Sequence, residues 1–189
     1  MTARRGSAIA LTVVAIAVVL SLFGSTAGAL PPGVVENCSS QSGGGFAGAL
    51  TKPRNLVVGP LALIGAGGTP VYADSLGGGS DGGQKFPALV KVGHQVTVEL
   101  SKQTRRDAGL AYGPLPQRWG SLRGAHRVVT FIACRRAEAS RSSADGQAVT
   151  FWSGGVVARS PRCVPLRVWV DAERSPRRAV IRLGVRRCG

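Results

Sequence analysis

The four cysteines have the greatest capacity for chemistry in this sequence, and they are Cys38, Cys134, Cys163 and Cys188. None belongs to a C-x-x-C pair and none clusters with a histidine, so their spacing fits neither a zinc site nor a thioredoxin-like redox motif. An even number of cysteines predicts disulfides where a chain works in an oxidising compartment. We therefore expect the cysteines to fasten the fold rather than to catalyse or to bind a metal.

The other reactive residues form no recognisable catalytic set. His94 and His126 have no second histidine at metal-ligand spacing, and the stretch FWSGG around Ser153 lacks the first glycine of a G-x-S-x-G elbow. The nine acidic residues are scattered, and Glu99 is expected on the solvent side of a strand. We therefore expect no catalytic residue, no metal and no cofactor. The alternative is a hydrolase whose site is assembled from distant loops and uses Ser153 or His126.

One long segment, residues 102–126, concentrates arginines and aromatic residues. Guanidinium groups bind oxyanions through paired hydrogen bonds, and aromatic rings stack on sugars or bases. The segment is therefore the candidate binding loop, although a solvated loop whose Trp119 packs against the edge of the domain would have the same composition. The candidate binding residues are Arg105, Arg106, Tyr112, Arg118, Trp119 and Arg123.

The charge balance is strongly basic. The chain has 24 Lys and Arg residues against nine Asp and Glu residues, and 44% of its residues are hydrophobic, which excludes a disordered tail. Two explanations of the basic excess stay open: a coding bias toward arginine, or attraction to an anionic partner. No localised nucleic-acid motif is present, so no nucleic acid is expected. The expected partners are an anionic cell-envelope polymer, a lipid headgroup or another envelope protein.

Residues 1–30 have the pattern of an export segment. Arg4 and Arg5 precede an apolar run over 8–24, and Ala27-Gly28-Ala29 fits a signal-peptide cleavage site. The segment fits a cleaved signal peptide and, because it approaches the ~20 residues that a spanning helix needs, also a transmembrane anchor. Both place the remaining chain outside the cytoplasm, either secreted or membrane-anchored. Without the two arginines, the remaining 22 basic residues against nine acidic ones leave +13.

Beyond the export segment the sequence predicts strands. Short β-branched runs alternate with Gly, Pro and Ser, and Val96, Val98 and Leu100 alternate with polar residues, which indicates a strand with one buried face. This pattern predicts an all-β fold, an antiparallel β-sandwich preceded by one N-terminal apolar helix. The predicted strands are 55–67 with a kink or bulge at Gly59-Pro60, 86–101 with a joint at Gly93, 127–135, 148–159, 163–172 and 179–188.

The predicted domain organisation has three parts: the export segment 1–30, an extended segment 31–54 tied in by Cys38, and a β-sandwich domain 55–189. Two further segments are expected to be irregular. Residues 75–84 form a glycine-rich loop and residues 135–147 a polar hairpin loop. Gly154-Gly155 is expected to form a bulge or a close-packed position.

The stretch VKVGHQVTVEL, residues 90–100, resembles the V-x-x-G-x-x-V-T-V strand of immunoglobulin-like domains in exported bacterial proteins. The layout as a whole resembles uncharacterised exported proteins of GC-rich bacteria. The resemblance implies an immunoglobulin-like sandwich and no activity. The Cys…Trp…Cys spacing of antibody-type domains is absent, so that topology is not expected.

Strand direction selects one of the three pairings that four cysteines allow. If 127–134 runs upward, the next strand runs downward and Cys163 begins at the bottom. The terminal hairpin, turning near Ser175-Pro176, then returns Cys188 to the same end, while Cys134 lies ~25 Å away. A disulfide needs Cα atoms within ~7 Å. The predicted disulfides are Cys163–Cys188 and, by elimination, Cys38–Cys134.

The same hairpin argument predicts a register. Setting Val168 opposite Leu183 places Cys163 opposite Cys188, both on the outer face, and puts Trp169 across from Arg182 for a cation–π contact.

Three functions stay open from the sequence. The favoured one is a non-enzymatic extracytoplasmic module that binds an anionic envelope component or a protein partner. The alternatives are the loop-assembled hydrolase and a structural subunit of an envelope complex.

Overall fold

The computed structural model describes residues 33–68, 71–75, 80–113 and 120–189, which belong to a compact unit spanning Pro32–Gly189. Within these ranges the regular secondary structure is almost entirely β-strand, with single 3-10 turns at Cys38–Ser40 and Ala137–Ala139. The expectation of a β-rich fold is confirmed. The predicted export segment and its apolar helix, residues 1–30, lie outside the described residues.

None of the helical segments in the described residues has the length and apolar character to cross a membrane.

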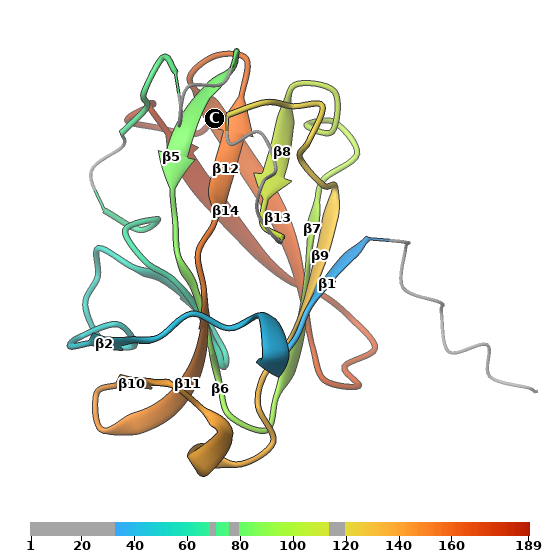
Figure 1. Ribbon diagram of the computed structural model, residues 1–189. Coiled ribbons are helices and arrows are strands. Elements are labelled where there is room, and N and C mark those ends of the chain that lie inside the picture. The colour runs from blue at the N-terminus through green and yellow to red at the C-terminus, as the bar shows by residue number, and fades with distance from the viewer. Residues whose placement is uncertain (1–32, 69–70, 76–79, 114–119) are drawn as a thin grey trace, which may run out of the picture. The chain divides into compact units, whose positions relative to one another are not determined.

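The first layer is a five-stranded sheet (Figure 1). Its neighbouring strands run antiparallel, except that the first two in the order run parallel. The buried residues Val96, Val98 and Leu100 line its inner face, as their alternation predicts. In spatial order the strands are β1 (Val34–Glu36), β9 (Val128–Ile132), β7 (Gln95–Leu100), β13 (Arg162–Val170) and β14 (Arg177–Leu183).

The second layer consists of two sheets that lie end to end and have no strand in common. The six-stranded sheet has the order β2 (Gly44–Phe46), β10 (Ser142–Ala144), β11 (Gln147–Trp152), β6 (Ala88–Lys91), β4 (Leu61–Leu63) and β3 (Leu56–Val58). The three-stranded sheet has the order β5 (Gly82–Lys85), β12 (Gly155–Ala158) and β8 (Ala108–Ala111).

Both sheets of the second layer meet at a bend. β5 leads into β6 through Phe86 and Pro87, and β11 leads into β12 through Ser153 and Gly154. At the bend the Phe86 N–H donates to the Gly154 carbonyl at 2.9 Å, so pairing is carried across it. A Cβ at Gly154 would lie 1.9 Å from Cδ1 of Tyr112, so this position needs glycine for close packing, as the sequence predicts.

The main core lies between the two layers. Phe131 at its centre contacts Tyr112 edge-on, with ring centroids 5.1 Å apart, and Trp152 at 5.2 Å. A second, smaller cluster lies on the opposite face of the six-stranded sheet, where Phe46 and Leu50 pack over Leu89. Because both faces of that sheet are covered, the first three residues of β6, Ala88, Leu89 and Val90, are all apolar and buried.

Three predicted segments need correction. Residues 55–67 form a hairpin, β3 and β4, with Gly59 at φ +59° in its turn, rather than one kinked strand. Residues 148–159 form two strands in different sheets, β11 and β12, rather than one strand. By contrast, residues 86–101 form β6 and β7, joined as predicted at Gly93, which has φ +87°. The predicted irregular loop 102–126 contains β8.

Both disulfides form as predicted. Cys38 and Cys134 are joined with Cα atoms 4.7 Å apart, and Cys163 and Cys188 with Cα atoms 5.7 Å apart. The first disulfide attaches the segment 31–54, which also supplies β1 and β2 to the two layers.

The predicted register of the terminal hairpin is wrong. Val168 lies opposite Arg177 instead of Leu183, because the connection begins at Asp171, which adopts a left-handed φ of 50°. Cys188 therefore lies beyond the end of β14, and the tail returns to reach Cys163.

The partner predicted for Trp169 is wrong for the same reason. Its ring is covered by Arg167, whose guanidinium carbon lies 4.9 Å from the ring centroid, rather than by Arg182. Arg182 instead donates to the carbonyls of Gly67, Gly68 and Arg186.

Candidate anion-binding site

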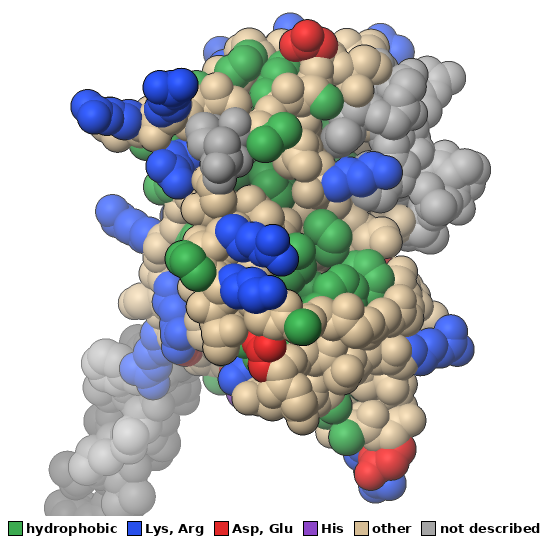
Figure 2. All heavy atoms as spheres, turned by 90° about the vertical axis from the view of Figure 1, so that its left-hand side faces the viewer, with side chains coloured by type: hydrophobic (Ala, Val, Ile, Leu, Met, Phe, Trp, Pro, Cys, Tyr) green, Lys and Arg blue, Asp and Glu red, His purple; other side chains and the backbone are tan. Residues whose placement is uncertain are grey.

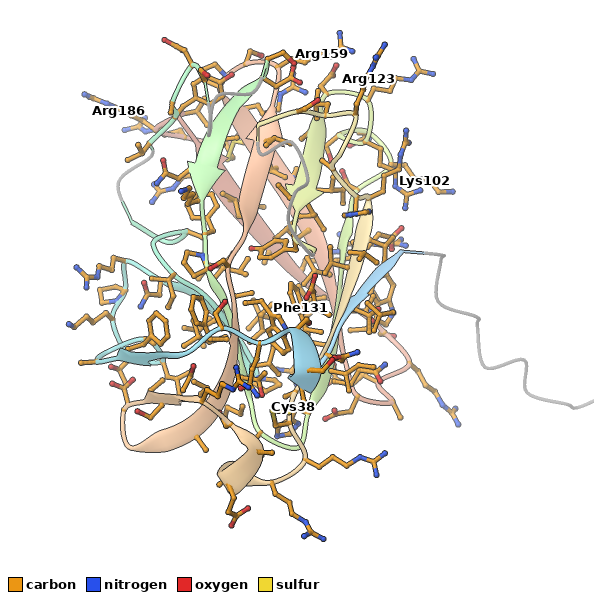
Figure 3. All side chains as sticks on the ribbon, viewed as in Figure 1. Cys38, Lys102, Arg123, Phe131, Arg159 and Arg186 are labelled. Atoms are coloured by element: carbon orange, nitrogen blue, oxygen red, sulfur yellow. A yellow bond between two sulfur atoms is a disulfide. The ribbon has the colours of Figure 1, made fainter. Side chains whose placement is uncertain are left out.

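A hollow of about 350 Å³ opens where three separate parts of the chain meet. Five arginines line it: Arg105, Arg106, Arg123, Arg127 and Arg159. Small or apolar residues complete it: Ala108, Gly109, Leu122 and Ala125. Figure 3 shows Arg123 and Arg159 together at the top of the two-layer fold. Cys38 lies in the lower half, and Phe131 lies above it in the middle of the fold.

The turn between β7 and β8 presents the first two arginines. Its first residue, Ser101, accepts hydrogen bonds from the Thr104 N–H at 3.1 Å and from the Thr104 hydroxyl at 3.0 Å. The Thr104 carbonyl in turn accepts from the Ala108 N–H at 2.9 Å. This compact turn places Arg105 and Arg106 directly before β8.

The segment before β9 presents two more arginines because it lies directly against β8. The Leu110 and His126 backbones exchange two hydrogen bonds of 2.8 Å, and the Leu122 N–H donates to Asp81 at 2.9 Å. A Cβ at Gly109 would lie 2.3 Å from the Ala125 side chain, so this close approach depends on glycine. Arg123 and Arg127 are therefore held on the wall of the hollow, and Arg159 joins them from the end of β12.

Arg105 is the one lining arginine with an ion pair within the described residues. It pairs with Glu99 and donates from Nε to the Leu100 carbonyl at 3.2 Å. The second oxygen of Glu99 accepts from Arg167 at 2.7 Å. Glu99 was expected to face solvent but is 2% exposed, because the two guanidiniums cover its carboxylate. This group positions Arg105 at the hollow.

The other four arginines, Arg106, Arg123, Arg127 and Arg159, are exposed and have no carboxylate oxygen within 4 Å among the described residues. All nine acidic residues of the chain lie in the described ranges. The hollow is therefore a concentration of uncompensated positive charge.

The neighbouring carboxylate of Asp107 is already committed to another residue. It pairs with Arg162 at 3.0 Å, and this hydrogen bond, with the charges of Arg162, Arg159 and Arg106, holds the pKa of Asp107 below its usual range despite some desolvation. At neutral pH it remains charged and moderates the potential near the hollow without pairing with the lining arginines.

Positive charge is also spread more widely. On the face drawn in Figure 2, Lys and Arg side chains are scattered over the surface and Asp and Glu side chains are few. The hollow differs because its arginines converge on one space. Convergence of donors, rather than the overall charge, marks a binding site.

Of the predicted binding residues, the structure brings Arg105, Arg106 and Arg123 together at the hollow. Tyr112 is not part of this site, because its ring is buried in the core. The Tyr112 ring is 3% exposed, and its hydroxyl donates to the Phe86 carbonyl at 2.5 Å. Burial raises its pKa, and the ring cannot stack on a ligand. Arg118 and Trp119 lie outside the described residues.

Sequence reasoning missed Arg127 and Arg159. Arg127 immediately precedes β9 and Arg159 immediately follows β12, so each reads as a residue at the end of a strand. No local signal links Arg159 to a segment more than thirty positions earlier. Only the pairing of β12 with β8 brings them together.

The alternative catalytic residues do not meet in a recognisable set. Ser153 is exposed between β11 and β12, and its hydroxyl has no histidine partner among the described residues. His126 has a buried Nε2 without a hydrogen-bond partner in those residues. His94 lies 2.8 Å from Asp171. No group of three or more His, Cys, Asp or Glu residues in the described ranges is arranged to hold a metal.

Comparisons of the chain with protein-family models, with curated proteins and with solved structures gave no match. The fold and the site therefore define the class: a disulfide-bonded, β-rich protein with an arginine-lined hollow.

Proposed function

We propose that this protein is a non-enzymatic extracytoplasmic module that binds an anionic component of the cell envelope in its arginine-lined hollow. The observation that carries the proposal is the convergence of four arginines without carboxylate partners, among the described residues, on one space of about 350 Å³. Guanidinium groups form short, charge-assisted and frequently bidentate hydrogen bonds with phosphate and carboxylate groups.

The extracytoplasmic location rests on two independent features. The sequence of residues 1–30 has the pattern of an export segment, and both cysteine pairs form disulfides, which persist mainly in oxidising compartments. The protein is membrane-anchored if the segment is retained and secreted if it is removed. Mass spectrometry of the mature N-terminus separates the two.

The fold proposal is an immunoglobulin-like sandwich of the kind found in uncharacterised exported proteins of GC-rich bacteria. It is supported by two packed layers of mainly antiparallel strands and by an edge strand, β1, parallel to β9. The V-T-V run that carries the resemblance forms the middle of β7, between β9 and β13.

The experiment is a binding assay between the full chain and isolated anionic wall polymer at 0.05 M and 0.5 M NaCl. We expect binding that falls steeply with salt, because exposed charges are screened. The double variant Arg123→Gln, Arg159→Gln should bind weakly at either salt concentration. Its matched control, Arg135→Gln, Arg136→Gln, changes the same number of exposed charges outside the hollow. Binding that is absent, insensitive to salt or equal in the two variants contradicts the proposal.

A further inference from the structure

The lining of the hollow limits the ligand by hydrogen-bond type as well as by charge. Its five guanidiniums donate hydrogen bonds and cannot accept them. Ala108, Leu122 and Ala125 have no polar side-chain atom. No side chain on the described wall therefore accepts a hydrogen bond. The side chains of the wall therefore match a group whose oxygens only accept hydrogen bonds, such as a phosphate, better than a group rich in hydroxyl, amine or amide N–H donors.

The number of available charges limits the ligand further. Arg106, Arg123, Arg127 and Arg159 are free of carboxylate partners among the described residues, so four positive charges face the space. A single phosphate group carries about 1.5 to 2 negative charges near pH 7 and would leave the cluster undercompensated. Two linked phosphates carry about three and supply oxygens to guanidiniums from more than one of the three lining segments.

The size of the hollow and the placement of its arginines fit a compact anionic group. The arginines come from three segments, 105–106, 123–127 and 159, so they approach the ligand from more than one strand end. The volume of about 350 Å³ lies at the lower end of the ~300–1,000 Å³ that small-molecule sites occupy. A compact diphosphate fits within this volume and leaves room for part of a carrier.

We propose that the hollow binds a diphosphate group. This rests on the proposed function and names its ligand chemistry. The diphosphate can be free, or carried by a nucleoside or by an isoprenoid alcohol. Leu122 and Ala125 offer apolar contact to a carbon chain leaving the diphosphate, so the carriers have to be compared directly.

The test is calorimetric titration of the full, disulfide-bonded chain with inorganic pyrophosphate, orthophosphate and sulfate at 0.15 M NaCl and pH 7.5. We expect pyrophosphate to bind about tenfold more tightly than either single anion, since it engages additional charge-assisted hydrogen bonds. Arg123→Gln and Arg159→Gln should each weaken pyrophosphate about tenfold. Arg135→Gln is the matched control and should leave the affinity unchanged. Unaltered thermal melts establish that the variants fold.

The outcomes separate this proposal from the proposed function. Equal affinities for pyrophosphate, orthophosphate and sulfate, all lost in Arg123→Gln, overturn the diphosphate and keep the anion-binding function. No binding of any anion overturns both, and so does pyrophosphate binding that survives both substitutions. Titration with geranyl diphosphate and uridine diphosphate identifies the carrier: tighter binding of one supports that carrier, and weaker binding of both supports free diphosphate.

Discussion

Two regions of the two-layer fold, marked in Figure 3 by Cys38 in the lower half and by Arg123 with Arg159 at the top, differ in how their polar side chains are used. Near Cys38, the Gln41 side chain donates to the Ala139 carbonyl at 2.8 Å. The disulfide joins Cys38 to Cys134, two residues after the end of β9. At the hollow, four arginines have no carboxylate partner within the described residues. The first region is held by a covalent crosslink and by a hydrogen bond to the backbone, whereas the second gathers four arginine side chains around one space.

The comparison separates stability from binding. Groups that are already paired within the chain stabilise the fold, and groups held in place without partners can exchange water for a ligand. Substitutions near Cys38 should therefore change the free energy of unfolding and leave anion affinity intact. Substitutions at the hollow should do the reverse.

The largest effect on the free energy of unfolding is expected from removing the Cys38–Cys134 disulfide. Cys38→Ala, Cys134→Ala releases a crosslink with a sequence separation of 96, worth ~4.7 kcal/mol in the chain-entropy model. Cys163→Ala, Cys188→Ala, with a separation of 25, should cost ~3.5 kcal/mol. Urea unfolding measures both. A larger loss from the shorter loop, or a change in anion affinity of the folded protein, would count against the comparison.

The second effect is on affinity. Arg123→Glu, Arg159→Glu should weaken pyrophosphate binding by roughly 100-fold, because two charge-assisted contacts are lost and two repulsive charges are added. The control Arg135→Glu, Arg136→Glu carries the same change in net charge outside the hollow. Calorimetry gives the affinities. Equal losses in the two variants would mean that overall charge, rather than the hollow, binds the anion.

The third effect concerns the buried carboxylate beside the hollow. Glu99→Gln leaves Arg105 and Arg167 without their shared anion and should lower the free energy of unfolding by roughly 2 kcal/mol. Glu173→Gln breaks the exposed pair with Arg177 and should leave the unfolding midpoint nearly unchanged. Chemical denaturation of the two variants side by side is the measurement. Equal unfolding midpoints for the two variants would show that the buried ion pairs of Glu99 stabilise the fold no more than the exposed pair of Glu173.

A smaller effect should come from the acid beside the hollow. Asp107→Asn removes a negative charge that acts on Arg106 and Arg159 and frees Arg162. Pyrophosphate should then bind about threefold more tightly at low salt, and the gain should shrink as salt is added. A gain that persists at 1 M NaCl would point to a change of shape instead of charge.

The smallest effect is a pH dependence at a turn outside the hollow. Hydrogen bonds from the Leu50 and Gly48 N–H groups lower the pKa of Asp145 in the folded state. Its stabilisation is therefore present above the unfolded value of about 3.9 and is lost as pH falls through the folded pKa. The melting temperature of Asp145→Asn should lie below that of the wild type at pH 7, and the difference should narrow toward pH 3. A constant difference would show that the charge plays no part.

The sequence predicts those features that depend on local pattern. The alternation of Val96, Val98 and Leu100 identifies the inner face of β7, strand direction identifies the Cys163–Cys188 disulfide, and elimination then leaves the other pair. Prediction from the sequence fails where a distant strand decides whether a segment becomes a strand. Residues 108–111, Ala-Gly-Leu-Ala, have little strand propensity and form β8 because β12 pairs with them and Gly109 admits Ala125.

The residues of the candidate site divide in the same way, into those that local sequence indicates and those that only the fold brings together. Clustered arginines predict Arg105, Arg106 and Arg123, since they are close in sequence. Tyr112 has the composition of a ligand contact but lies under Gly154, where the absence of a side chain leaves room for its ring. Arg159 belongs to the site only through the bend that aligns β12 with β8, and no spacing rule anticipates it.

The Cys38–Cys134 bond also determines how the protein carries tension. β1 is three residues long and is held on one side by β9, so hydrogen bonds alone would let a pull from the N-terminal side peel it away. A force applied from the N-terminal side can detach the residues before Cys38. At Cys38 the force passes through the disulfide to Cys134, which lies next to the core strand β9. The arginine-lined hollow is thereby isolated from a pull on the chain that precedes β1.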